Sequence, residues 1–271
     1  LRGVDEEVVA RFEEAASKQW NIVKNAGRSE IRENADGSVT VVAKRTTENG
    51  EELLEIPADA VLVATGRRPN TDTLNAKNYF DVQDGGQLSV DKYQRVLYNG
   101  APVPGVYALG DVSSRYQLKH VANHEARVVQ HNLSHPEDLR ASDHRYVPGA
   151  IFSNPQIAVV GMTEEQAREA AAREGFEITV KAQNFGDTAY GWAMEDKIGL
   201  CKLIARKDNG ELLGAHLVGE ESSVLIQPLL QAMSFGMDAR TLARGQYWIH
   251  PALTEIVENA LLGLEFDEPA N

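Results

Sequence analysis

The residues best suited to chemistry lie near the end of the chain, where a histidine directly precedes a proline and a carboxylate follows five positions later. These residues are His250, Pro251 and Glu255. A proline restricts the local backbone, and the bond before it can be cis, so this step can direct the imidazole out of the fold. A nearby carboxylate can fix the tautomer of the ring and raise its basicity, which predicts a general acid/base that works near neutral pH. For a lone His-Pro step, a histidine that caps or packs near a helix start would be the favoured interpretation.

Two glycine turns, each after an apolar run, form a second group of candidates. Residues 60–64 end at Gly66, and residues 105–109 end at Gly110 and Asp111. Glycine lets the backbone approach a ligand closely, and the aspartate can accept hydrogen bonds from the hydroxyls of a sugar-like chain. The helix expected from Lys119 adds free N–H groups at its start. Taken alone, a Gly-Asp step is usually just a turn, and the motif around Gly66 is equally typical of a β-turn.

Composition limits the function further. The chain has 271 residues and a net charge of −13, without a basic patch, which argues against nucleic acid and anionic membranes as partners. No apolar run is long enough to span a bilayer. The single cysteine, Cys201, excludes an internal disulfide and a cysteine-based zinc site, and it indicates a cytoplasmic location. His120 and His124 are spaced for one helix face, but packed or solvated histidines are favoured over a metal site.

The hydrophobic periodicity predicts two kinds of region. Up to residue 134, the pattern predicts helices and short strands with turns at Asp36-Gly37 and Asn49-Gly50. After residue 145 it predicts an α+β unit around a central antiparallel sheet, with a capping box at Thr163 and a kink at Pro228. The predicted helices are 5–18, 119–133, 163–175, 222–235 and 253–264, and the predicted strands are 39–43, 52–56, 60–64, 105–109, 156–161, 177–184, 199–205 and 212–218.

Three segments, in their order along the chain, resemble the two-dinucleotide-binding flavoprotein disulfide reductases. They are Ala-Thr-Gly-Arg-Arg-Pro-Asn at 64–70, Gly-Val-Tyr-Ala-Leu-Gly-Asp-Val at 105–112 and Ile-His-Pro-Ala-Leu-Thr-Glu at 249–255. The resemblance covers essentially the whole chain. It implies a partial dinucleotide-binding and FAD-closing region followed by an α+β dimerisation domain. The implied parts are residues 1–69 for the second half of the NAD(P)H-binding domain, 70–144 for the end of the FAD-binding region and 145–271 for the interface domain.

The resemblance also implies roles for single residues. His250 would be the acid/base that serves a pair of thiols, oriented by Glu255 and reaching across a two-fold axis to the partner subunit's flavin. The residues implied to contact FAD are Gly66, Gly110, Asp111, Gln117, Leu118 and Lys119. The implied cofactors are FAD and NAD(P)H, the partners are a second copy of the chain and a small-molecule disulfide, and NADH and NADPH are left undistinguished.

This sequence departs from the family pattern in what it lacks. The glycine fingerprints Gly-x-Gly-x-x-Gly and the pair of redox cysteines are absent. We therefore expect the chain to be the carboxyl-terminal part of a longer enzyme and to be inactive alone, and retention of FAD by the chain stays open. A different class of function is an assembly module that dimerises from about Arg145 onward without chemistry. A third reading, with Cys201 as nucleophile and His250 as base, is disfavoured because Cys201 falls in an apolar strand pattern.

Overall fold

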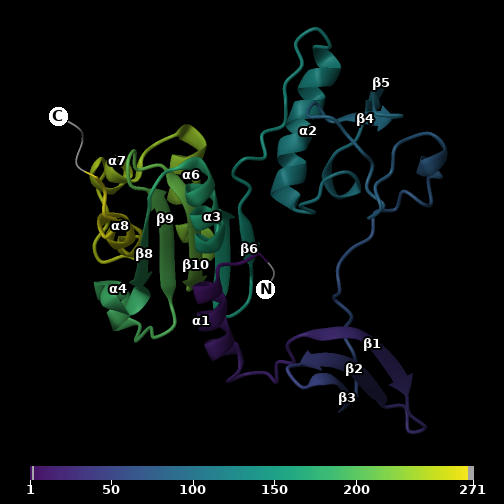
Figure 1. Ribbon diagram of the computed structural model, residues 1–271, viewed down its shortest axis with the longest axis horizontal. Coiled ribbons are helices and arrows are strands. Elements are labelled where there is room, and N and C mark those ends of the chain that lie inside the picture. Colours follow the sequence, from purple (N-terminus) through teal and green to yellow (C-terminus); the bar gives the residue numbers. More distant parts are fainter. Residues whose placement is uncertain (2, 268–271) are drawn as a thin grey trace. The chain divides into compact units, whose positions relative to one another are not determined.

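A computed structural model gives the structure of residues 1 and 3–267. The chain divides into two compact units, which are described separately. One unit consists of residues 19–68, and the other joins residues 1–18 to residues 69–271. Figure 1 labels their helices and strands.

The smaller unit is a three-stranded antiparallel sheet in the order β1-β2-β3. Its strands are β1 (Ala26–Glu33), β2 (Val39–Thr47) and β3 (Gly50–Ala58). The predicted turns at Asp36-Gly37 and Asn49-Gly50 join them, and both glycines have the positive φ that such turns need. The strand β1 was not predicted, because its sequence is mostly polar.

The prediction of a buried strand at 60–64 is wrong. These residues are irregular, and Leu62 is 91% exposed. A strand needs a neighbour to accept and donate its backbone hydrogen bonds. Among the described residues no strand pairs with this run, so its apolar composition alone does not produce a strand.

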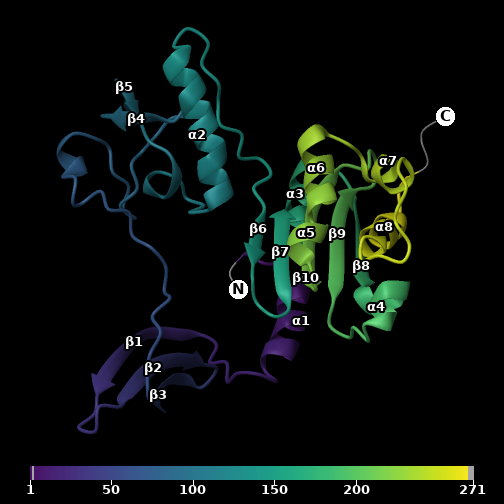
Figure 2. The ribbon, with the colours of Figure 1, turned by 180° about the vertical axis from the view of Figure 1, so that it is seen from behind.

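Within the larger unit, residues 69–144 carry a short hairpin and one long helix (Figure 2). The elements are η1 (Ala76–Asn78), β4 (Arg95–Tyr98), β5 (Ala101–Tyr107), η2 (Gly110–Val112) and α2 (Lys119–Ser134). The small core of this region contains Ala76, Leu88, Val96 from β4, and Ala108. The polypeptide passes from β5 through η2 to α2, so the predicted cofactor turn directly precedes the predicted helix.

Residues 145–267 build a five-stranded antiparallel sheet in the order β6-β7-β10-β9-β8, which confirms the predicted α+β architecture. Its strands are β6 (Gly149–Ile151), β7 (Gln156–Gly161), β8 (Ile178–Asn184), β9 (Leu200–Arg206) and β10 (Leu212–Gly219). The helices and η elements of this region are α3 (Glu164–Glu174), η3 (Phe185–Asp187), α4 (Ala189–Ala193), α5 (Ser222–Leu225), α6 (Gln227–Phe235), α7 (Ala239–Arg244) and α8 (Glu255–Leu262).

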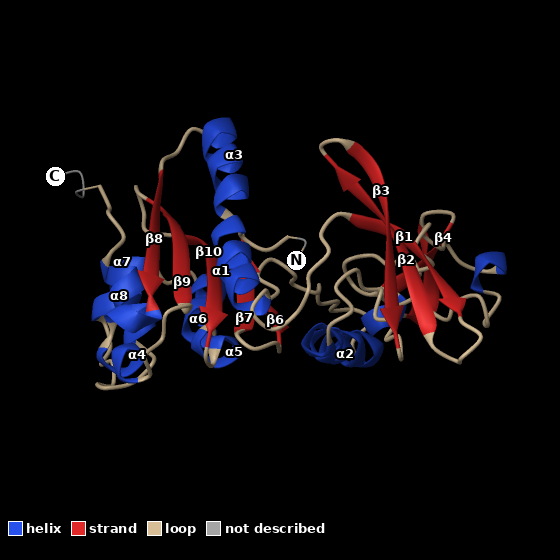
Figure 3. Cartoon of the chain, turned by 90° about the horizontal axis from the view of Figure 1, so that it is seen from below, coloured by secondary structure: helices blue, strands red, loops and turns tan. Residues whose placement is uncertain are grey.

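Helices cover both faces of this sheet (Figure 3). The larger core includes Cys201, Leu203 and Leu217 from the sheet and packs against α5, α6, α7 and α8. On the other face, α3 and the amino-terminal helix α1 (Glu6–Ala16) contact the strands. Side chains alternate between the faces because the strand period is two residues.

Local signals explain several element ends. The predicted capping box forms, with Thr163 Oγ1 accepting from the N–H of Gln166 and Gln166 accepting from the N–H of Thr163. Near Pro228 the predicted single helix is divided into α5 and α6, and the proline occupies the first turn of α6, where its missing N–H costs little. The short elements β4, β6, α4 and α7 were not predicted.

Candidate functional site

The predicted histidine and glutamate are in direct contact. His250 Nδ1 lies 2.7 Å from Glu255 Oε1. The histidine side chain is 68% exposed, whereas that of Glu255 is 17% exposed. A shielded carboxylate that accepts from Nδ1–H places the lone pair of the neutral ring on Nε2. For Nε2 the described residues offer no hydrogen-bond partner, so this nitrogen can exchange a proton with an incoming group.

The backbone before His250 presents alternate side chains to the core and to solvent. Trp248 packs against the larger core and its Nε1–H donates to Ala243 O at 2.9 Å. Tyr247 and Ile249, on either side of it, are 102% and 73% exposed. The partly buried indole therefore anchors a segment whose neighbouring residues point outward, and His250 follows with a cis peptide bond to Pro251.

Glu255 is held in place by its own position at the start of α8. It is the first residue of that helix, where a carboxylate interacts favourably with the helix dipole. Its second oxygen, Oε2, accepts from the N–H of Ala252 at 3.4 Å. The orienting carboxylate is thus itself oriented by the turn that carries the histidine.

The second group of candidates surrounds the turn η2. Gly110 has a φ of +70°, and a Cβ added there would lie 3.2 Å from Ala122 Cβ. Both the conformation and the close packing on α2 favour glycine. Asp111, the next residue, is half-buried within the same turn.

The loop before α2 brings the remaining predicted residues to the start of the helix. Gln117 adopts a φ of +50°, Leu118 is the N-cap, and Lys119 begins α2. Leu118 provides no side-chain cap, so the first N–H groups of this 16-residue helix have no capping oxygen from the N-cap residue. Such a helix start favours an electron-rich group. With the close-packed glycine and the carboxylate of Asp111, these residues fit a flavin with a hydroxylated side chain.

Glu125, in α2, contacts this turn and was not predicted from the sequence. Its side chain is 1% exposed and accepts from the N–H of Gly110 at 2.6 Å through Oε2. His144 Nε2 lies 3.1 Å from Glu125 Oε1, close enough for an ion pair but without the alignment of a hydrogen bond. A charged residue at a buried position of α2 was the signal that could have identified it.

The predicted residues form two groups and one isolated member. His250 and Glu255 are together, and so are Gly110, Asp111 and the start of α2. Gly66 lies in the smaller unit, where it is exposed with a φ of +116°.

The structure gives no chemical role to the other residues that the sequence analysis considered, Cys201, His120 and His124. Cys201 is fully buried in β9, and burial raises the pKa of its thiol, as expected for a structural residue. Within residues 1 and 3–267, no group of three or more His, Cys, Asp or Glu side chains is arranged to hold a metal ion. His120 and His124 instead line a cavity of about 650 Å³ with His144, Phe152 and Leu230, outside the predicted site.

No described helix is long and apolar enough to cross a membrane.

Two family models match the chain, one in each half. Residues 1–126 match the model described as pyridine nucleotide-disulphide oxidoreductase. Residues 147–261 match the dimerisation domain of the same oxidoreductases. The His250 pair lies in the second match, and the Gly110 turn lies in the first.

Individual proteins give the same similarity. The chain is 51% identical over 97% of its length to the mycothione reductase of Mycobacterium tuberculosis, of which it covers 55%. It is 32% identical over 96% of its length to the dihydrolipoyl dehydrogenase of a Synechocystis strain, of which it covers 54%. Among solved structures, the HOCl-induced flavoprotein disulfide reductase RclA from Escherichia coli has a TM-score of 0.81 at 27% identity, with 97% of this chain and 57% of that chain covered. The chain thus spans about half the length of the curated relatives it matches.

Proposed function

Because the chain belongs to the pyridine nucleotide-disulphide oxidoreductase family, we propose that His250 and Glu255 are the acid/base pair of a flavin-dependent disulfide reductase. The observation that carries this proposal is the 2.7 Å contact between His250 Nδ1 and Glu255 Oε1 on an imidazole that is otherwise exposed. A buried or unpaired histidine would not offer both a fixed tautomer and an accessible Nε2.

The proposed work of the pair is proton transfer between sulfur atoms. Nε2 takes the proton of a thiol as that thiol becomes a nucleophilic thiolate. It returns the proton to the thiolate that leaves when the substrate disulfide breaks. Each disulfide R–S–S–R′ gains two electrons and two protons in total and yields two thiols. Glu255 stabilises the protonated ring between the two transfers.

The sulfur pair and the second subunit complete this proposal. Cys201 is buried, so the redox thiols come from outside these 271 residues. We propose that the enzyme is a homodimer through residues from about 145 onward and that His250 acts on the partner's sulfur pair. The match to a dimerisation domain and the exposed side chains of Tyr247 and Ile249 support this arrangement.

FAD and NAD(P)H are the proposed cofactors. When bound, FAD transfers electron pairs from NAD(P)H to a disulfide. Asp111 would accept hydrogen bonds from the ribityl hydroxyls, and the start of α2 at Lys119 would face the pyrimidine side of the ring. Gly110 would let the backbone approach the cofactor, and Gly66 would lie near the junction of the two cofactor regions.

Mycothione is the proposed disulfide. The 51% identity to a mycothione reductase exceeds the 32% identity to a dihydrolipoyl dehydrogenase over a similar share of the chain. The residues Tyr247 and Trp248 before the His-Pro step, and residues 257–264 after it, also resemble mycothione reductase. A dihydrolipoamide dehydrogenase-like or glutathione reductase-like enzyme is the alternative within the family, and a cytoplasmic location stays a prediction.

The test is His250→Gln and Glu255→Gln in the full-length enzyme, with Glu258→Gln on the same helix as the control. We expect His250→Gln to lower disulfide turnover by about 100-fold or more, because general acid/base catalysis contributes that much. Reduction of FAD by NAD(P)H should stay at the wild-type rate in all three variants. Normal disulfide turnover in His250→Gln would contradict the proposed role.

For the 271-residue chain on its own, we propose a dimerising module without disulfide reductase activity. The single buried cysteine favours this second function, because no thiol in the chain can attack a disulfide. Sedimentation and a flavin absorbance scan of the purified chain test it. A colourless monomer would contradict dimerisation, and disulfide turnover by the chain alone would contradict the lack of activity.

A further inference from the structure

A lysine lies within the sheet face that packs against α1 and α3. Lys202 in β9 alternates with Leu200 and Ile204 on this face, and it is 5% exposed. A buried ammonium group is stable only when its hydrogen-bond donors are paired. The partners of this ammonium group therefore show which segment binds to this face of the sheet.

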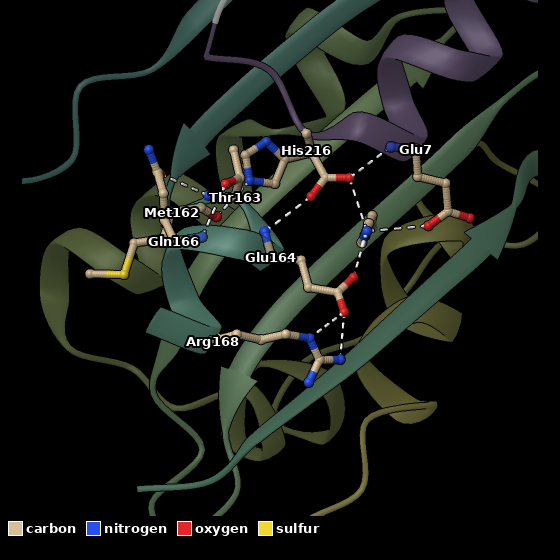
Figure 4. A network of polar contacts seen from close by, with 9 residues as sticks. Glu7, Met162, Thr163, Glu164, Gln166, Arg168 and His216 are labelled. Carbon is tan, nitrogen blue, oxygen red and sulfur yellow. Dashed lines mark hydrogen bonds and ion pairs between the residues drawn. The ribbon is translucent and has the colours of Figure 1, made fainter. Parts of the chain in front are cut away.

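Three carboxylates surround the ammonium group of Lys202. Its Nζ lies 2.7 Å from Glu164 Oε2, 2.9 Å from Asp5 Oδ1 and 3.3 Å from Glu7 Oε2. Figure 4 shows Glu7 and Glu164 in this network. Although burial alone would lower the pKa of Lys202, the hydrogen bonds to Glu164 and Asp5 raise it to about 12. Two of the three acids, Asp5 and Glu7, come from the amino-terminal segment.

Asp5 is bound at two helix starts at once. It is the N-cap of α1, where Oδ1 accepts from the N–H of Glu7 at 3.1 Å. Its other oxygen, Oδ2, accepts from the N–H of Glu164 at 3.0 Å, in the first turn of α3. The residue is 2% exposed. The sheet face thus presents a carboxylate site made of one ammonium group and one helix N–H, and Asp5 fills it.

The residues just before α3, whose first N–H donates to Asp5, make a second buried contact. His216 in β10 is buried, and its Nε2 lies 2.7 Å from Met162 O, next to the capping box of α3 (Figure 4). Burial lowers the pKa of His216, so the neutral ring donates to this carbonyl. The chain just before α3 is therefore held by a contact that does not involve Asp5.

The rest of α1 follows the same face. Val8 is fully buried against Ile157, Leu200 and Val218. Farther along, Arg11 donates to Asn184 Oδ1 at 2.8 Å. Apolar contacts thus hold the helix along its length, while the charged contacts set its position at one end.

We propose that Asp5 is a docking residue that fastens the segment entering the nucleotide-binding half to the dimerisation domain. The receiving site is Lys202 with the first turn of α3, and the ligand is the α1 carboxylate of the same chain. The two sides belong to the two different family matches, residues 1–126 and 147–261. This inference concerns the joining of the two domains and does not depend on the acid/base role of His250.

The test is hydrogen exchange of the α1 amides in Asp5→Asn. Asparagine is as good an N-cap as aspartate, so α1 keeps its own cap. The amide group, however, cannot accept from both Lys202 and the N–H of Glu164 with charged oxygens. Since hydrogen bonds to charged groups are stronger than those between neutral groups, α1 amides should exchange about tenfold faster or more. Amides of β9 should keep their wild-type protection.

Glu14→Gln is the matched control, because Glu14 is also on α1 and lies 3.3 Å from a lysine, the exposed Lys18. It should change α1 exchange by about twofold at most. Equal exchange in Asp5→Asn and Glu14→Gln would overturn the proposal. If Asp5→Asn fails to fold, Asp5→Asn/Lys202→Met should fold, since it also removes the buried ammonium group that has lost one of its three carboxylates. A double variant that also fails to fold would contradict the docking role.

Discussion

The N–H of Gly110 donates to the buried carboxylate of Glu125 at 2.6 Å, so one turn of α2 holds the turn that carries Asp111. The two residues are 15 positions apart, and no other acceptor for this N–H occurs among the described residues. A backbone donor fixed by a carboxylate is held more strongly than one fixed by a neutral group. The geometry of the proposed flavin turn thus depends on a residue that need not touch the flavin.

Two substitutions of Glu125 test its role as the acceptor for the N–H of Gly110. Glu125→Ala leaves the buried N–H of Gly110 without an acceptor and should lower the free energy of unfolding by about 1–3 kcal/mol. Glu125→Gln keeps an acceptor oxygen and should lose less, although the contact with His144 loses its charge. Urea unfolding measures both, and Asn123→Ala, on the exposed side of the same helix, is the control. An equal loss of unfolding free energy in Glu125→Ala and Asn123→Ala would show that Glu125 does not hold the Gly110 turn.

Gly110→Ala tests the close packing of the turn on α2. Gly100 provides a matched control, since it has a φ of +74° with no atom within 4 Å of an added Cβ, whereas Gly110 has a φ of +70° and meets Ala122. Gly100→Ala should cost about 1–2 kcal/mol from the backbone conformation alone. Gly110→Ala should cost more in the same unfolding measurement, and an identical cost would show that the turn has room for a side chain.

Cys201 should be unreactive in the native chain. It is buried in the sheet core, and burial raises the pKa of its thiol, so little thiolate is available to attack a reagent. A chromogenic disulfide reagent should therefore label it only after addition of urea. Rapid labelling of the folded chain would revive the reading of Cys201 as a nucleophile.

The sheet of residues 145–267 was largely predictable, because its signals are local. The turn at residues 208–210 joins β9 and β10, and the capping box at Thr163 marks the start of α3. The run at 60–64 has similar apolar content but forms no strand. The difference lies in the neighbour, since a strand exists only where another pairs with it.

The candidate site was predictable only where its residues are close in sequence. His250 and Glu255 are five positions apart, and their spacing alone suggested the contact. Glu125 and Gly110 meet because α2 packs back on its preceding turn, which no periodicity reveals. Asp5 and Lys202 are 197 positions apart, and their pairing depends on the whole sheet. A lysine in an apolar strand pattern predicts a partner but does not identify it.

The buried cluster around Lys202 should make stability depend on pH at both extremes. Burial alone would raise the pKa of Asp5, but the N–H of Glu164 and Lys202 hold it below its usual 3.8. The hydrogen bond from Lys202 likewise holds the pKa of Glu164 below 4.5. Carboxyl groups with lowered values stabilise the fold above their usual pKa and lose this contribution as pH falls through the lowered one. Lys202, raised from 10.5 to about 12, stabilises the fold below pH 10.5 and loses this contribution as pH rises toward about 12.

The stability difference between the wild-type chain and Asp5→Asn should therefore be level from about pH 5 to about pH 10 and shrink on either side. On the acid side it shrinks because protonated Asp5 resembles asparagine. On the alkaline side it shrinks because neutral Lys202 no longer needs a counter-charge. Urea unfolding of both proteins across this range measures the difference, and Glu14→Gln, whose glutamate is exposed, should show no such plateau. A difference that stays constant down to pH 2 would mean that the charge on Asp5 does not contribute to holding α1.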